Sequence, residues 1–357
     1  MKYFLFWTLF LLGMLCFLFL CFESSLRLFF PQPIGPPAFA FDPRLGAIPV
    51  PAQSAIRSLP GDGFYTSTND ASGMRVSGLS REDGARPRIL FLGDSFTYGT
   101  GVSDAETFSA RIEASLPKAL VWNAGNPGTG TDYALKFLRV RGAELAPEII
   151  VLGFFANDFA DNGGDRYFRR ENSGLLKEQD LNQTFAFFRE KEAISKSPVY
   201  VWLTQWSHSL SLLRRWLAWR NLGGGSRGFA TLLKNEFNLT PFERGIANDP
   251  LKLLTETYLR ALSEEAKTLG ARLEIFYFPN QIDFRQAVNK GSLGKDEEAF
   301  RSLIEKIGLK QNSLTLAFQR SGKGEAELFL HDGHYSRDGH KVLAEEIMKE
   351  LGFTPTQ

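Results

Sequence analysis

The stretch RILFLGDSFTYG, residues 88–99, decides the fold of this chain. Its first half is a short apolar run that ends at Gly93, which is the pattern of a buried β-strand. Its second half is polar and places Ser95 directly after that strand. A buried strand that ends in a polar loop is typical of a parallel sheet, in which ligands bind outside the carboxyl ends of the strands.

The same pattern continues along the chain, with helical segments between the apolar runs. Further strands are predicted at 119–125, 148–155, 272–278 and 326–330, and helices at 105–116, 131–145, 249–270, 295–308 and 338–351. Asp104 and Asp338 are expected to cap the first and the last of these helices. Alternating strands and helices predict an α/β fold with a central parallel sheet between two layers of helices.

The N-terminal segment from Tyr3 to Phe22 is apolar and carries no charge. About 20 helical residues at roughly 1.5 Å each span about 30 Å, the thickness of the hydrocarbon core of a bilayer. A cleavable signal peptide is the alternative, but its apolar core is normally shorter and its cleavage site close behind. The small-x-small site Ala38-Phe39-Ala40 lies far downstream. We therefore expect an uncleaved transmembrane anchor over residues 1–24.

The charges beside this segment predict its orientation. Lys2 precedes the span, and the positive-inside preference then favours a cytoplasmic N-terminus and an exported body. The protein is thus expected in the inner (cytoplasmic) membrane as a single-pass protein, with its catalytic domain facing the periplasm or the exterior. Residues 25–85 are rich in proline up to about residue 60 and are expected to form an extended tether and lead-in to a domain over 86–352.

Composition argues against several classes of partner. The net charge is +1 and there is no strong basic block, so nucleic acid is not expected. The two cysteines lie in the apolar N-terminal segment and form no zinc-type cluster with histidine, so no metal site is expected.

Residues 159–248 interrupt the alternation and are expected to form a helical insertion. Within it, 201–220 holds four of the six tryptophans of the chain. Its large apolar residues fall on one helical stripe, formed by Trp202, Trp206, Leu210, Leu213 and Leu217. Two interpretations remain open: a helix packed on the domain core, or an interfacial helix or lid that lies on the membrane.

Four polar motifs follow the predicted strands. They are GDSFTYG (93–99), NAGNPGTGTD (123–132), GFFAND (153–158) and HDGHYS (331–336). In this order they resemble the motifs of the SGNH branch of the GDSL esterase/lipase superfamily. The resemblance covers about 88–158 and 272–351, and leaves the insertion unmatched. It implies a flavodoxin-like three-layer α/β/α sandwich and a serine ester hydrolase that needs no cofactor.

The resemblance also implies a role for each motif. Ser95 is implied as the nucleophile, and its N–H, the N–H of Gly128 and the side-chain amide of Asn157 as the oxyanion hole. A serine hydroxyl needs a nearby base to take its proton, and preorganised donors stabilise the negative charge of the tetrahedral intermediate. This chain departs from the third motif at Phe155, where the family usually has glycine.

The base is expected in HDGHYSRDGH (331–340), which holds three of the four histidines. His334 follows the predicted last strand and precedes the final helix, so it is the expected base, since imidazole titrates near neutral pH. Asp332 is expected to orient it. The family generally has an aspartate three residues before the histidine, where this chain has His331.

The other histidines are expected to have different roles. His331 is interpreted as a residue that lines or supports the site, and His340 as a structural residue in the first turn of the final helix. His208 lies in the insertion and is expected to have no catalytic role. Asp94 is expected to organise the nucleophile turn through backbone hydrogen bonds.

The sequence thus predicts a membrane-anchored serine esterase that hydrolyses O-acyl esters, with O-acetyl the preferred case, on an envelope glycan or lipid through an acyl-Ser95 intermediate. Two alternatives remain. An envelope O-acetyltransferase would pass the same acyl group to a sugar hydroxyl. A non-catalytic envelope assembly protein would keep only the scaffold, and the intact Ser, Asn and His set argues against it.

Overall fold

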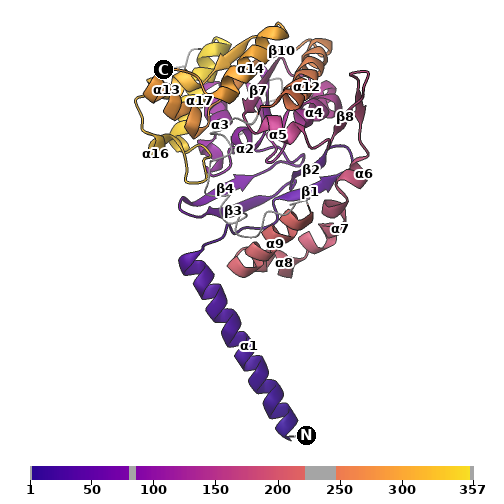
Figure 1. Ribbon diagram of the computed structural model, residues 1–357, viewed down its shortest axis with the longest axis vertical. Helices are drawn as coiled ribbons and strands as arrows, with labels where there is room; N and C mark the ends of the chain where they lie inside the picture. Colours follow the sequence, from indigo (N-terminus) through magenta and orange to yellow (C-terminus); the bar gives the residue numbers. More distant parts are fainter. Residues whose placement is uncertain (1, 80–85, 222–246, 354–357) are drawn as a thin grey trace.

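The structure is a computed structural model that describes residues 2–79, 86–221 and 247–353. Its centre is a five-stranded parallel sheet in the order β11-β10-β7-β5-β6 (Figure 1). The strands are β5 (Arg88–Gly93), β6 (Leu120–Asn123), β7 (Ile149–Phe155), β10 (Arg272–Phe278) and β11 (Gln311–Ser313). The strand order reverses between β5 and β7, and doubly wound sheets bind their ligands at this switch point.

Helices cover both faces of the sheet, because successive residues of a buried strand point to opposite sides. Leu90 and Leu92 face one layer, formed by α4 (Thr131–Leu145), α12 (Asp249–Thr268) and α14 (Lys295–Lys306). Ile89 and Phe91 face the other, formed by α3 (Phe108–Ser115), α13 (Gln281–Lys290), α15 (Thr315–Arg320) and α17 (Arg337–Leu351). The predicted three-layer α/β/α sandwich is confirmed.

The predicted last strand at 326–330 is wrong. Glu325–Leu328 form the short helix α16, and Phe329 makes only an isolated β-bridge with Tyr335. Leu328 and Phe329 are buried against the helical layer, which accounts for the apolar pattern. The fifth strand is instead β11, whose three polar residues give no strand signal.

The lead-in is not the extended tether that was predicted. β1 (Phe39–Asp42) pairs with β2 (Gly46–Pro49), and β3 (Ser54–Leu59) pairs with β4 (Gly63–Thr68), in two antiparallel hairpins. Leu45 and Ile48 are buried in the same core as α4, so the apolar residues between the prolines have a surface to cover. The hairpins lie between the sheet and α1 (Figure 1).

The insertion begins with the short elements α5 (Asp158–Asn162), β8 (Phe168–Arg170), β9 (Leu176–Glu178) and α6 (Leu181–Thr184). It continues with α7 (Ala186–Ser195), α8 (Pro198–Thr204) and α9 (His208–Asn221). The single helix expected over 201–220 is therefore two helices, with a break at 205–207. The rest of the insertion, 222–246, and residues 80–85 of the lead-in lie outside the described residues.

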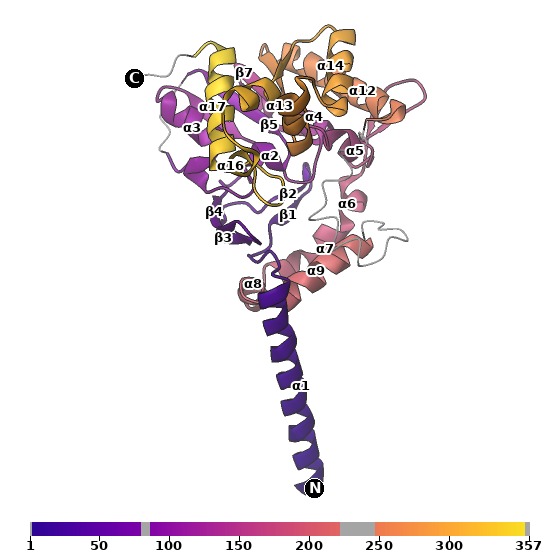
Figure 2. The same ribbon diagram turned by 60° about the vertical axis from the view of Figure 1, so that its left-hand side comes forward.

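Helix α1 (Lys2–Phe29) projects from the domain in both views (Figures 1 and 2). It is long and apolar enough to cross a membrane, a property that an N-terminal signal sequence shares. Its apolar side chains are exposed, whereas Glu23 and Leu26 near its end are buried against the domain.

Candidate active site

Three residues from two distant parts of the chain form one hydrogen-bonded series. Ser95 begins α2 (Ser95–Tyr98), directly after β5, and His334 lies in the loop between α16 and α17. Nε2 of His334 lies 2.9 Å from Oγ of Ser95, and Nδ1 lies 2.9 Å from Oδ2 of Asp332. Asp332 also accepts a hydrogen bond from the backbone N–H of His334, at 3.1 Å. The structure thus brings together the three residues predicted for nucleophile, base and orienting carboxylate.

The electrostatics of the pair follow from this contact. Burial lowers the pKa of His334, but the charge and hydrogen bond of Asp332 outweigh burial, so the pKa lies above the usual histidine value. Burial raises the pKa of Asp332, and the contacts with His334 more than offset this, so that pKa is lowered. Asp332 therefore stays ionised and favours the tautomer with a proton on Nδ1. Nε2 is then free to accept the proton of Ser95.

The turn that carries Ser95 is held by the two residues that precede it. Oδ1 of the fully buried Asp94 accepts from Phe96 N at 2.9 Å, as expected for a turn-organising residue. Burial raises the pKa of Asp94 to about 6. At the preceding position only glycine fits, because a Cβ at Gly93 would lie 2.6 Å from the carbonyl oxygen of Gly153 on β7.

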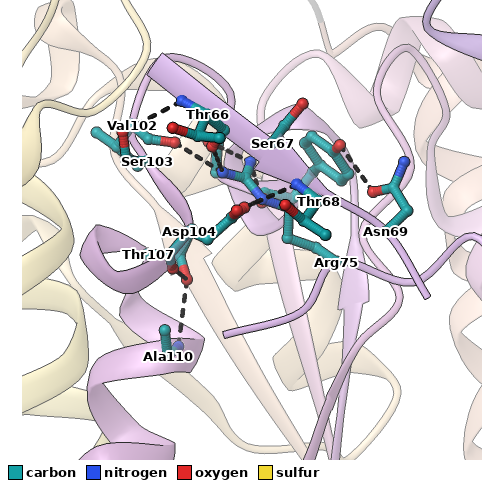
Figure 3. Close-up of polar contacts among 12 residues, drawn as sticks. Thr66, Ser67, Thr68, Asn69, Arg75, Val102, Ser103, Asp104, Thr107 and Ala110 are labelled. Atoms are coloured by element: carbon teal, nitrogen blue, oxygen red, sulfur yellow. Dashed lines mark hydrogen bonds and ion pairs between the residues drawn. The ribbon is translucent and has the colours of Figure 1, made fainter. Parts of the chain in front are cut away.

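The far end of α2 is held by Arg75, whose guanidinium is fully buried. Figure 3 shows its polar contacts with the surrounding segments. Its donors are taken up by Asp104 Oδ1 at 2.7 Å, Gly99 O at 3.0 Å, and Thr66 O and Val102 O at 2.8 Å each. Asp104 is therefore not the predicted helix cap. It lies in the short turn η1 (Asp104–Glu106), and Thr107 caps α3 by accepting from Ala110 N. Arg75 could not be predicted from the sequence, because most of its partners are backbone carbonyls of remote segments.

The two other predicted oxyanion donors lie at the carboxyl edge of the same sheet. Asn157 follows β7, and its Nδ2 donates to Oδ2 of Asp161 at 3.0 Å. A primary amide carries two N–H groups, and the Asn157 side chain also makes a hydrogen bond that lowers the pKa of Asp94. Within the described part of the chain, no acceptor is bound to the N–H of Ser95 or of Gly128.

Arg166 connects the two donor loops. Its Nη1 donates to the carbonyl of Gly128 at 2.7 Å, and its Nη2 lies 3.4 Å from Oδ1 of Asp161. It thus fixes the peptide of Gly128 and the carboxylate that holds Asn157. Neither Arg166 nor Asp161 was predicted from the sequence. Asp161, one helical turn after Asn157, carried a usable signal, whereas Arg166 carried none.

The departure from the family pattern at Phe155 has a packing role. Its ring stacks on Phe96 with centroids 3.6 Å apart, and the Phe96 ring lies 4.8 Å from the imidazole of His334. Phe155 is buried. A glycine there would leave the ring beneath the imidazole without this contact.

His331 lies beside the site and has its own carboxylate. Its Nδ1 lies 2.8 Å from Oδ1 of Asp62, which sits in the turn between β3 and β4. This hydrogen bond and the charge of Asp62 raise the pKa of His331. The imidazole is 70% exposed, and Asp62 was not foreseen from the sequence.

His340 is buried in a different environment. Its Nδ1 accepts from Phe108 N at 3.2 Å, and burial lowers its pKa to about 3, so it is neutral at pH 7. Ser336, not Asp338 as predicted, caps α17. The carboxylate of Asp338 instead lies 2.7 Å from the ammonium group of Lys323.

Comparison with known proteins decides the family. Residues 91–342 match the model of the GDSL-like lipase/acylhydrolase family. The chain belongs to this family. It is therefore an SGNH-type serine ester hydrolase. No curated protein is significantly similar to the sequence.

Several solved structures are similar to the chain. LAE5, an α/β hydrolase from the metagenome of Lake Arreo in Spain, is 13% identical and has a TM-score of 0.42, with coverage of 75% of this chain and 96% of that one. Axe2, an acetylxylan esterase of Geobacillus stearothermophilus, is 14% identical with a TM-score of 0.39, covering 78% and 99%. The psychrotrophic esterase EstA of Pseudoalteromonas sp. is 13% identical with a TM-score of 0.38, covering 75% and 97%. The family assignment rests on the match over 91–342 alone.

Proposed function

We propose that the protein is a membrane-anchored serine esterase in which Ser95 is the nucleophile, His334 the general base and Asp332 the carboxylate that orients the base. The observation that carries the proposal is the unbroken series of hydrogen bonds from Ser95 Oγ through the imidazole to Asp332. Family membership supplies the reaction class, and this series supplies the residues.

The proposed reaction has two halves. Oγ of Ser95 attacks the carbonyl carbon of the ester while Nε2 of His334 takes the hydroxyl proton. The tetrahedral intermediate collapses, and the leaving alkoxide takes that proton from the imidazolium, which leaves an acyl group on Ser95. A water molecule then attacks this acyl group with the same base, and the carboxylic acid is released.

The oxyanion of each intermediate would be stabilised by the N–H groups of Ser95 and Gly128 and by the side-chain amide of Asn157. Donors of this kind typically contribute about 3–4 kcal/mol each to the transition state. Arg166 and Asp161 support this role, because they hold the Gly128 peptide and the Asn157 amide in fixed positions before substrate binds. Preorganised donors need no rearrangement during the reaction.

The apolar helix α1 supports a proposal for the cellular location of the enzyme and for its substrate. Helix α1 is taken to keep the enzyme in the inner membrane, with the domain over 86–352 exported. The substrate is then an O-acyl ester, preferentially an O-acetyl ester, on an envelope glycan or lipid. The two hairpins within residues 39–68 would be exported together with this domain.

The test is product analysis with the full-length protein in detergent. Aryl esters from acetate to octanoate are supplied with and without glycan acceptors, and products are identified by mass. We expect the free acid from the wild type and from Ser302→Ala, an exposed serine on α14, and none from Ser95→Ala. Acyl groups found on the glycan would make the enzyme a transferase, and no product from any ester would favour the non-catalytic alternative.

A further inference from the structure

Helices α8 and α9 lie on the side of the domain that carries α1 (Figures 1 and 2), and these helices and the break between them expose large apolar side chains. The exposed set consists of Val199, Trp202, Leu203, Trp206, Leu213 and Leu217. Trp202 and Trp206 are 61% and 55% exposed. An exposed apolar group of this kind, with two tryptophans, marks a surface that contacts something other than water.

The end of α1 is bonded to the corner between these two helices. Glu23 is the first charged residue after the apolar stretch. Its carboxylate accepts hydrogen bonds from the backbone N–H groups of His208 and Ser209, both at 2.8 Å, and so caps α9. Arg27 donates to the carbonyl of Trp206. The corner is therefore fixed at the level where the apolar part of α1 ends.

A second contact behind α1 stiffens this junction. Nδ1 of His208 accepts from Gln32 N at 2.8 Å, so the chain leaving α1 is bonded to the start of α9 as well. This explains the histidine of the insertion without a catalytic role. The anchor and the two helices are thus joined on both sides of the corner.

These contacts determine how far Trp206 lies from the hydrocarbon core of the bilayer. If the stretch that ends at Phe22 fills the hydrocarbon core, residue 27 lies five residues, or about 7.5 Å, above its edge. The headgroup region on each side of a bilayer is roughly 5–8 Å thick, and tryptophan favours that region. Trp206, whose carbonyl is bonded to Arg27, then lies at the headgroup level.

Two charged side chains of α9, Arg214 and Arg215, are bonded to the chain that follows α1. Arg215 Nη1 donates to Oε1 of Gln32 at 2.6 Å, and Arg214 Nη1 lies 3.4 Å from the carbonyl of Gly35. These two guanidinium groups are therefore used within the protein, which leaves the exposed face apolar and aromatic. Such a face suits the interface of a zwitterionic bilayer, with no need for anionic lipid.

We propose that residues 198–217 form a membrane-docking surface that lies in the headgroup region beside α1 and holds the domain in one orientation. The inference rests on the proposed function in that α1 is taken to span the bilayer. In Figure 1, α2 and α5, which follow the carboxyl ends of β5 and β7, lie on the side of the sheet that faces the hairpins and α1. The docked domain therefore directs the Ser95 end of its sheet toward the membrane, where an ester held at the bilayer surface would meet it.

The test places a fluorophore at defined positions of the full-length chain in nanodiscs of phosphatidylcholine. Cys16 and Cys21, the two cysteines of the chain, are first replaced by serine. Leu203→Cys on the docking surface, Leu12→Cys in α1 and Val288→Cys on α13 then each carry an NBD group. Val199→Cys gives a second probe of the docking surface, and hydrolysis of a soluble aryl ester checks that each labelled protein is folded.

Lipids with a nitroxide near the headgroup should remove most of the emission at position 203 and leave position 288 unchanged. A deep nitroxide should quench position 12. Quenching at 12 but not at 203 or 199 would overturn the docking surface and leave the anchor intact, and emission at 203 shifted to the blue without lipid quenching would indicate a protein partner instead. No quenching at 12 would overturn the anchor and the docking surface together, while ester hydrolysis reports separately on the catalytic assignment.

Discussion

The tripeptide Asp-Gly-His occurs twice within nine residues, at 332–334 and 338–340, and the two copies have opposite environments. In the first copy the carboxylate and the imidazole bind each other at 2.9 Å, and the ring reaches Ser95. In the second copy the carboxylate faces Lys323, and the imidazole is buried against Phe108. One histidine has a raised pKa and the other a pKa of about 3.

The difference arises from the backbone. The first copy lies in a turn, where Gly333 has a φ of 90° and residues two apart can face each other. The second copy lies in the first turn of α17, where side chains at positions i and i+2 point in different directions. Its glycine has a packing role, because a Cβ at Gly339 would lie 2.4 Å from the carbonyl oxygen of Leu328. A motif is therefore only as informative as the backbone that carries it.

The largest expected difference between the copies is in catalysis. His334→Ala should lower kcat/KM for an activated ester by about 10⁴-fold or more, because the base is lost. Ser95→Ala should have a similar effect, and the double variant should lose little more, since both residues serve one step. His340→Ala should keep its activity per folded molecule. An active His334→Ala beside an inactive but stable His340→Ala would reverse the assignment.

Asp332 and Asp338, the carboxylates of the two copies, should also differ in their effect on kcat/KM. Asp332→Asn should reduce kcat/KM by roughly 10²- to 10⁴-fold, because the tautomer is no longer held. The charge of Asp332 raises the pKa of His334, so its removal should move the acid limb of the pH–rate profile to lower pH. Asp338→Asn should leave both the rate and the limb unchanged. Profiles of kcat/KM from pH 4 to 9 for the three proteins decide this, and an unmoved limb in Asp332→Asn would exclude the proposed contact.

Residues that follow β7 should also contribute to catalysis with the first Asp-Gly-His copy. Asn157→Ala should lower kcat by roughly 100- to 1,000-fold with a smaller change in KM, since the amide acts on the transition state. Asp161→Asn should lower kcat less, because it loosens the amide without removing it. Steady-state kinetics with one activated ester provide both values. A pure KM effect in Asn157→Ala would assign that residue to substrate binding.

The smallest expected effects concern the stability of the second copy. His340→Ala should lower the free energy of unfolding by about 1–3 kcal/mol, because the buried N–H of Phe108 loses its acceptor. Asp338→Ala should cost less than about 1 kcal/mol, since its ion pair with Lys323 is partly open to solvent. Because the folded state holds His340 neutral, the wild type should lose stability as pH falls from about 6.5 toward 3. Urea denaturation at pH 7 and pH 5 tests the order, and equal losses in the two variants would contradict it.

Much of the fold follows from local sequence pattern. The helices at 131–145 and 249–268 and the strands β5, β7 and β10 have strong periodicity or long apolar runs, and their predicted bounds agree with the structure within two residues. The pattern failed where burial comes from remote packing. Leu328 and Phe329 give the apolar pattern of a strand, although they lie at the end of a helix. Strand β11 contains no apolar residue and therefore gives no strand pattern.

The residues of the site also fall into those that local sequence predicts and those that depend on remote contacts. Ser95, Asp332 and His334, which the structure brings together, could be predicted because each lies in a motif beside a predicted strand end. Asp62, Arg166 and Arg75 were not predicted, because each acts through a contact between remote segments of the folded chain. Asp161 was overlooked although its position one helical turn after Asn157 is a local signal. The N-terminal hairpins were missed for a related reason: proline-rich sequence gives no pairing signal until the domain core offers a surface for Leu45 and Ile48.

Covalent labelling with a fluorophosphonate probe tests the assignment of Ser95 and His334 in one measurement. The probe is added to wild type, Ser95→Ala, His334→Ala and His340→Ala, and the labelled peptide is identified by mass. We expect one adduct, on Ser95, in wild type and in His340→Ala. Ser95→Ala should form no adduct, and His334→Ala should be labelled much more slowly than wild type. An adduct on another serine, or undiminished labelling of Ser95 in His334→Ala, would contradict that assignment.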